Sequence, residues 1–210
     1  VFGEKLGWER ANWFAANGEE PRDIYTFGLP NWHNAVAREH KAAREAAVLF
    51  DQTSFAKYIL TGPDAEQALQ WIASNRVDKP VGSIIYTQML NDNGGIECDL
   101  TCVRTKFNEY YITTGTGYAT HDFNWISRNI PSELNAQLID VTSSNAVLSL
   151  FGPNARDILQ VLTVNDVSDN GHPFGSARQI SIAGCLVLAM RITYVGELGW
   201  ELHFPVEYAQ

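Results

Sequence analysis

The residues best placed to do chemistry in this chain are single acids and tyrosines beside glycine turns. One acid, Asp99, lies in the segment NDNGGIECDLTCV at 91–103. The two glycines of this segment accept the positive φ of a tight turn, and the residues after them alternate between apolar and polar. The alternation predicts a strand with Ile96, Cys98 and Leu100 on its buried face and Asp99 on the other. A carboxylate there could transfer protons, although a solvated strand acid would show the same pattern.

A second group of candidates lies in RITYVGELGWEL at 191–202. Ile192 and Tyr194 are expected to end one strand, a glycine pair to form the turn, and Glu201 to lie on the next strand, which together predicts a hairpin. A carboxylate can accept two adjacent N–H donors in a bidentate pair, so Glu197 and Glu201 are both candidates to bind a ligand with such an edge. Glu201 is the stronger candidate, because a strand places a side chain more rigidly than a turn does.

The elements that must position these residues include an internal repeat. The segment YILTGPDA at 58–65 returns as LSLFGPNA at 148–155. Each copy predicts a strand, a Gly-Pro break and an amphipathic helix, with the proline in the first helical turn, where its fixed φ is suitable. Asn75 and Asn165 are expected to end these helices at matching points. Because ligands often bind between repeated subdomains, the repeat predicts a site between the two copies.

The order of these elements predicts an α+β fold of two similar subdomains, each with an antiparallel sheet and flanking helices. Hairpin-type links at 92–95 and 195–199 favour antiparallel over parallel pairing. A further helix is expected from about residue 34 to residue 49. The sequence has no G-x-G-x-x-G motif, so no dinucleotide site is predicted within it.

Composition argues against several classes of partner. The 210 residues are 45% hydrophobic, which is enough for a sizeable core, and their formal net charge of −9 disfavours a nucleic-acid partner. No run of about 18 apolar residues is present, so no membrane span is predicted.

The cysteines and histidines show no pattern typical of a metal site. The three cysteines include no C-x-x-C motif, and Cys98 and Cys102 are predicted to be small buried residues on one face of a strand. The histidines are predicted to cap helices or lie on the surface rather than to act in catalysis. These histidines are His33, His40, His121, His172 and His203.

Two segments together, YTQMLNDNGGIECDLTCVR and TYVGELGWEL, resemble the folate-binding aminomethyltransferase module of the glycine cleavage T-protein and of sarcosine and dimethylglycine dehydrogenases. The first residues, FGEKLGWERANWF, resemble the connector that follows the FAD-dependent part of those dehydrogenases. The resemblance covers nearly the whole chain. It implies a connector at 1–30 and a folate-binding domain at 31–210, with repeat units near 55–78 and 145–168. It also implies a T-protein-like fold truncated at the C-terminus, within a longer polypeptide.

The resemblance implies a role for five residues. Glu201 would hold the 2-amino-pyrimidinone edge of the pterin ring, and Tyr86 and Tyr194 would cover the ring faces. Thr114 would begin a stretch whose backbone approaches the ring. Asp99 would be the catalytic carboxylate, which deprotonates the attacking nitrogen of tetrahydrofolate and stabilises positive charge.

The function that the resemblance implies is one-carbon transfer to tetrahydrofolate, giving 5,10-methylenetetrahydrofolate. The one-carbon unit would come from sarcosine or dimethylglycine, oxidised by an FAD domain upstream in the same polypeptide. Cys98 stands where the T-protein usually has a second Asp, which favours the dehydrogenase branch. Two alternatives remain open: a noncatalytic folate-fold module with a regulatory role, and a stand-alone aminomethyltransferase of the glycine cleavage system. The resemblance implies a cytoplasmic location in a bacterium and the mitochondrial matrix in a eukaryote, with the folate tail held beyond Gln210.

Overall fold

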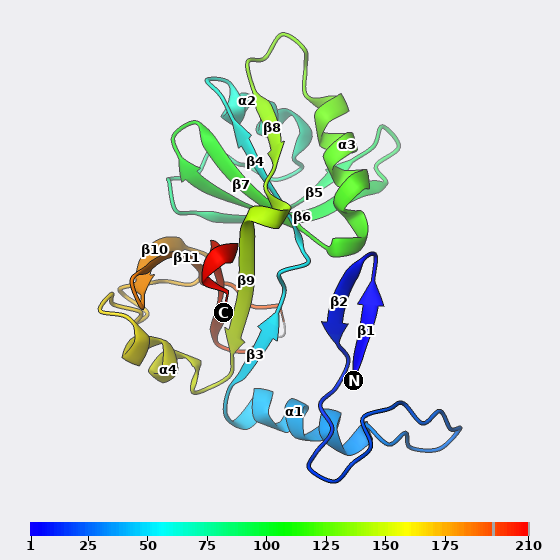
Figure 1. The fold of residues 1–210 in the computed structure, drawn as a ribbon. Helices are drawn as coiled ribbons and strands as arrows, with labels where there is room; N and C mark the ends of the chain where they lie inside the picture. Colours follow the sequence, from blue (N-terminus) through cyan, green and yellow to red (C-terminus); the bar gives the residue numbers. More distant parts are fainter. Residues whose placement is uncertain (195, 210) are drawn as a thin grey trace.

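The structure, a computed structural model, describes residues 1–194 and 196–209 and contains two five-stranded antiparallel sheets. Figure 1 shows the sheets as two subdomains, the first above the second, each with its own helices. This arrangement confirms the predicted α+β fold with antiparallel sheets. Within the described residues, no helix has the length and apolar character needed to cross a bilayer.

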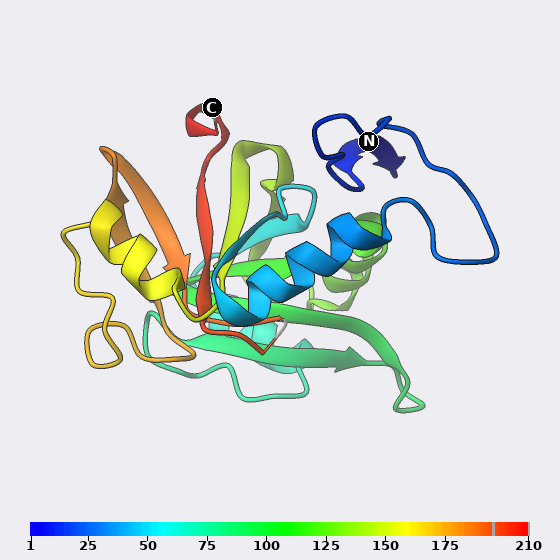
Figure 2. The same cartoon turned by 90° about the horizontal axis from the view of Figure 1, so that it is seen from below.

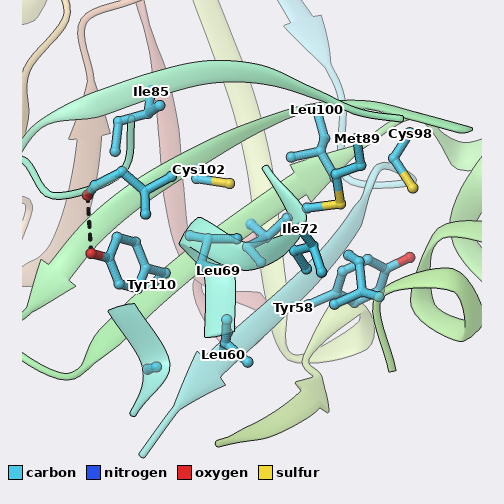
Figure 3. Packing of buried hydrophobic residues seen from close by; sticks show 14 of the residues in the cluster. Tyr58, Leu60, Leu69, Ile72, Ile85, Met89, Cys98, Leu100, Cys102 and Tyr110 are labelled. Carbon is cyan, nitrogen blue, oxygen red and sulfur yellow. Dashed lines mark hydrogen bonds between the residues drawn. The ribbon is translucent and has the colours of Figure 1, made fainter. Parts of the chain in front are cut away.

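The first sheet has the strand order β5, β6, β7, β4, β8, and two helices pack on one of its faces. In Figure 3, Leu69 and Ile72 of α2 lie among Tyr58 and Cys102 of the strands. Cys98 and Cys102 are both buried in this core, as the sequence predicts. The elements are β4 (Ala56–Thr61), α2 (Ala65–Ile72), β5 (Ile84–Leu90), β6 (Ile96–Lys106), β7 (Glu109–Thr114), the 3-10 turn η1 (Thr116–Tyr118), α3 (Ala119–Asn129) and β8 (Gln137–Asp140).

The second sheet has the strand order β10, β11, β12, β9, β3. Helix α4 covers it through Ala155 and Leu159, which pack with Trp200 and Leu202. The elements are β3 (Val48–Asp51), the 3-10 turn η2 (Thr142–Ser144), β9 (Asn145–Phe151), α4 (Ala155–Leu162), β10 (Ala177–Ile182), β11 (Cys185–Met190), β12 (Gly199–Pro205) and the 3-10 turn η3 (Val206–Tyr208).

The helix expected at 34–49 is shorter than predicted. Helix α1 (His33–Glu45) ends before Ala46, whose carbonyl accepts a hydrogen bond from Asn154 N at 3.0 Å. The chain then forms β3, in which Val48 pairs with Phe151 of β9. Pairing with a distant strand therefore overrides the helical pattern of the last residues.

The N-terminal segment forms a small hairpin of its own. Strand β1 (Phe2–Lys5) pairs with β2 (Trp8–Ala11), and no described residue at 12–32 belongs to a helix or strand. Figure 2 shows this hairpin away from both large sheets. Trp13 anchors the segment that follows, because it is buried and its Nε1 donates to Asp23 Oδ1 at 2.7 Å. The connector at 1–30 stays a prediction.

The internal repeat is visible in the structure as two matching strand–helix units. Gly62 and Gly152 follow β4 and β9 with φ values of +135° and +125°, a backbone conformation that glycine adopts readily. In the last turn of each helix a glutamine side chain binds the backbone of the segment that follows. Gln70 Nε2 donates to Asn75 O, and Gln160 Nε2 donates to Asn165 O. These asparagines lie three residues beyond the helix ends at Ile72 and Leu162 rather than at them.

The prolines of the repeat also lie slightly outside the predicted position. Pro63 and Pro153 precede the N-cap residues Asp64 and Asn154, so they belong to the turn rather than to the first helical turn. Their fixed φ still suits this position, because it directs the chain into the helix.

Strand β6 carries Asp99 and departs from strict alternation at its start. Met89 pairs with Cys98 but Leu90 pairs with Ile96, so the register shifts at this end of the strand. A bulge of this kind places two neighbouring residues of one strand opposite a single residue of the partner strand, and it rotates the residues that precede it. Ile96 is therefore 67% exposed, and its predicted burial is wrong, whereas Cys98 and Leu100 are buried as expected.

The two subdomains meet through a third, smaller core. Val103 and Tyr111 of the first sheet pack against Ala177 and Met190 of the second. A buried cation also joins them, because Lys57 Nζ of β4 donates at 2.7 Å to the carbonyls of Thr53 and Asn145. The face of the first sheet that carries Tyr111 therefore points toward the second sheet.

Candidate functional site

A cavity of about 740 Å³ lies between the two subdomains, within the size range of small-molecule sites. Strands β5, β6 and β7 with η1 and α3 supply one wall, and the segments around 174 and 192–201 supply the other. The lining residues include all five that the sequence singles out: Tyr86, Asp99, Thr114, Tyr194 and Glu201. The structure thus brings together side chains that are up to 115 positions apart, while their roles stay predictions.

Asp99 lies on the wall of this cavity that the first sheet provides. Its side chain is exposed and its Oδ1 accepts a hydrogen bond from Gln88 Nε2 at 3.1 Å, the residue opposite it on β5. Tyr86 lies two residues along β5 from Gln88. A hydrogen bond to Asp99 raises the pKa of the Tyr86 phenol, with burial and the charge of Asp99 adding to the effect. The two side chains therefore act on each other at the cavity surface.

Glu201 lies on the opposite wall, on β12, where it pairs with Met190 and Ser149 of the neighbouring strands. Its side chain is only 15% exposed, and its Oε2 lies 3.5 Å from Nε2 of His203. A central strand thus fixes a mostly buried carboxylate that faces the cavity.

The rival acid, Glu197, has another partner. Its Oε1 pairs with Arg44 NH1 of α1 at 2.5 Å, and it is not among the residues that line the cavity. The sequence favoured Glu201 over Glu197, and Glu201 is the one of the two acids that lines the cavity.

The hairpin that carries Tyr194 and Glu201 is wider than the sequence predicts. Strands β11 and β12 do pair, but β11 ends at Met190, so Ile192 and Tyr194 lie in the connection and not on a strand. Val195, within the predicted turn, lies outside the described residues. Tyr194 is 80% exposed and Tyr86 is 56% exposed, so both rings are accessible at the cavity.

Thr114 ends β7 and has a partner that the sequence did not indicate. Its Oγ1 donates to Asp122 Oδ2 at 2.6 Å, and Asp122 is 1% exposed although it is ionisable. The other oxygen, Oδ1, lies 2.9 Å from Nδ1 of His121, and His121 Nε2 lies 3.4 Å from Glu97. The hydrogen bond between His121 Nδ1 and Asp122 raises the pKa of the His121 imidazole. Three residues of the cavity lining, Thr114, Asp122 and Glu97, are therefore joined to one another directly or through His121.

Sequence reasoning missed Asp122 and misjudged two histidines. Asp122 carried one available signal, its place in the first turn of a helix after the glycines at 115 and 117. His172 and His203 are buried, at 0% and 4% exposure, so the predicted surface role is wrong for both. Strand alternation could not have placed His203 inside, since it shares the face of Glu201, opposite the apolar positions Trp200, Leu202 and Phe204 of β12.

Comparisons with known proteins agree on the family of this chain. The model of the GCVT N-terminal domain matches residues 1–210. The human mitochondrial sarcosine dehydrogenase is 36% identical over 98% of this chain and 26% of its own length. The 4-methylaminobutanoate oxidase (formaldehyde-forming) of Paenarthrobacter nicotinovorans is 38% identical over 99% of this chain and 25% of its own. The chain thus spans about a quarter of these relatives.

One solved structure shares the fold over the whole chain. The glycine cleavage system aminomethyltransferase T from Bartonella henselae superposes with a TM-score of 0.76 at 22% identity, covering 100% of this chain and 51% of that one. These matches confirm the family resemblance and the T-protein-like fold.

Proposed function

The chain belongs to the GCVT N-terminal domain family, and we propose that it is the tetrahydrofolate-binding part of an FAD-dependent N-methyl amine dehydrogenase or oxidase. The amine would be sarcosine or dimethylglycine, oxidised by an upstream FAD domain. This part would transfer the one-carbon unit to tetrahydrofolate, giving 5,10-methylenetetrahydrofolate. The relatives support this proposal, because two of them are named as a sarcosine dehydrogenase and a methylaminobutanoate oxidase.

The observation that carries the proposal is the composition of the cavity between the two subdomains. It presents two accessible aromatic rings, Tyr86 and Tyr194, a mostly buried carboxylate, Glu201, and a second carboxylate, Asp99, on the other wall. A flat pterin with adjacent N–H donors fits this donor and acceptor set, because it needs ring faces to stack on and a carboxylate to pair with its edge.

In this proposal each of the cavity residues has a separate role. Tetrahydrofolate, when bound, supplies the amine nitrogens that accept the one-carbon unit. Glu201 anchors and orients the ring, and the two tyrosines exclude water from its faces. Asp99 takes a proton at its carboxylate, which is exposed at the cavity. The negative charge of Asp99 also stabilises positive charge that develops beside it.

The test of the proposed site is the affinity for tetrahydrofolate when Glu201 is changed to Ala. Loss of hydrogen bonds to a charged acceptor costs about 1.5–3 kcal/mol, so the dissociation constant should rise about 10- to 150-fold. Glu197→Ala is the matched control, because that acid pairs with Arg44 away from the cavity, and its affinity should stay within about twofold of the unchanged protein. Calorimetry that gives equal affinities for both variants would refute the assignment of Glu201.

A further inference from the structure

A chain of three polar side chains crosses from one subdomain to the other behind Glu201. Tyr111 lies on β7 of the first sheet, and His203 lies on β12 of the second. The Tyr111 hydroxyl is 3.1 Å from Nδ1 of His203, and the two rings meet edge to face at 5.3 Å and 90°. The other ring nitrogen, Nε2, is 3.5 Å from Glu201 Oε2. The cavity acid is therefore linked through a histidine to the opposite sheet.

Tyr111 and His203, which form this link, are both buried, so their polar atoms depend on each other and on Glu201 for partners. Tyr111 and His203 are 6% and 4% exposed, and Nε2 of His203 is buried with no hydrogen-bond partner in the described residues. A buried ring nitrogen without a partner is uncommon and costs about 1–3 kcal/mol. The distance of 3.5 Å to Glu201 exceeds the usual 2.7–3.2 Å of an N–H···O bond, so this contact is an electrostatic attraction of an N–H group toward the carboxylate rather than a formed hydrogen bond.

The contacts of the two ring nitrogens indicate which of them carries a proton. If Nδ1 carried the proton, the lone pair of Nε2 would face the carboxylate of Glu201 and be repelled by it. Burial, helped by the charge of Glu201, raises the pKa of Tyr111 and keeps its hydroxyl protonated, so the hydroxyl can donate to Nδ1. The hydrogen bond made by one ring nitrogen determines which nitrogen is protonated. The proton therefore lies on Nε2, pointing at Glu201.

We propose that His203 is a positioning residue, which presents Nε2–H to Oε2 of Glu201 in a tautomer that Tyr111 of the opposite sheet holds in place. This inference rests on the proposed role of Glu201 in tetrahydrofolate binding. Its consequence is that the orientation of the binding carboxylate depends on correct docking of the two sheets. Of the residues opposite Glu201 on the neighbouring strands, Met190 is apolar, and the Ser149 hydroxyl already donates to Gln52 Oε1 at 2.6 Å, so neither side chain is an alternative donor to Glu201.

The first experiment needs no folate. In the protein labelled with ¹⁵N-histidine, the ring nitrogens of His203 are identified by their loss in His203→Gln. We expect the signals of an Nε2–H tautomer, which shift toward a mixture of tautomers in Tyr111→Phe and respond to Glu201→Gln. An Nδ1–H tautomer in the unchanged protein, or signals indifferent to both substitutions, would overturn the inference.

The second experiment compares two replacements of His203 in tetrahydrofolate binding. Glutamine places an N–H donor near the position of Nε2, whereas leucine fills similar space without a donor. The dissociation constant should rise about tenfold in His203→Leu and stay within about threefold in His203→Gln. Urea midpoints measured for both variants separate a folding defect from a local one. Equal weakening in the two variants would show that His203 only packs, which overturns the proposal.

The two experiments distinguish this inference from the proposed function. If tetrahydrofolate does not bind the unchanged protein, the proposed function fails. The tautomer and its response to Glu201→Gln and Tyr111→Phe would still establish that His203 positions Glu201. If folate binds but the tautomer is wrong, the proposed function stands and the positioning role falls.

Discussion

Replacing Asp99 with asparagine tests the proposed chemistry most directly. The side chain is exposed and Asn retains an oxygen that can accept the hydrogen bond from Gln88, so the fold should be unaffected. The change removes the base and the negative charge, which together contribute about 10²–10⁴ to the rate. We therefore expect methylenetetrahydrofolate formation to fall by about 100-fold or more, while amine oxidation continues and formaldehyde is released.

The assay follows amine consumption, free formaldehyde and methylenetetrahydrofolate together in the full polypeptide. Early time points and low folate are needed, because formaldehyde and tetrahydrofolate also condense without an enzyme. Tetrahydrofolate affinity should change by no more than a few-fold, since Glu201 would still anchor the ring. Asp92→Asn is the matched control, because it removes a charge from the same turn region but not from the cavity.

One result would refute the reasoning about Asp99. If methylenetetrahydrofolate still tracks amine consumption in Asp99→Asn, the acid is a solvated strand residue without a role in transfer.

An independent check is available from Tyr86, whose pKa is raised chiefly by its hydrogen bond to Asp99. In Asp99→Asn that pKa should fall toward its ordinary value, which ultraviolet titration against a Tyr86→Phe reference can measure.

Two further predictions concern stability. Gly184→Ala should cost about 1–2 kcal/mol for its φ of +81° alone. Gly152→Ala should cost a further 1–3 kcal/mol or so, because the new Cβ would lie 2.5 Å from Ala46 O; equal urea midpoints would contradict this. Burial lowers the pKa of Lys57 from 10.5 to about 8. Between pH 8 and pH 10.5 the unfolded chain therefore binds more protons at Lys57 than the folded chain does. The free energy of unfolding should rise with pH over this range. Lys57→Met should lose this gain, which urea titrations of both proteins at pH 8 and pH 10 would test.

Much of the fold was readable from local patterns. The repeated strand, Gly-Pro and helix units at 58–65 and 148–155 predicted two similar subdomains, because glycine conformation and helical periodicity are local properties. The places where this reading was wrong depend on distant partners. The last residues of the predicted helix at 34–49 pair with β9 instead, and a register shift against β5 exposes Ile96.

The candidate site, too, could be predicted from the sequence only in part. The types and spacing of Asp99 and Glu201 were visible in the sequence, as was the chemistry that two such acids could do. The sequence already favoured Glu201 over Glu197 because of its place on a strand, whereas the ion pair of Glu197 with Arg44, more than 150 residues away, was visible only in the tertiary structure. The place of Asp122 in the first turn of a helix was visible in the sequence, but its burial and its hydrogen bonds to Thr114 and His121 were not.

The sequence by itself determined which residues could bind, stack and transfer a proton, because those capacities belong to each side chain and its nearest neighbours. Only the tertiary structure decided that these residues meet in one cavity and that His203 faces Glu201 from within. Distances between segments and the burial of a charged group follow from how two sheets pack, and strand periodicity carries no information about that packing.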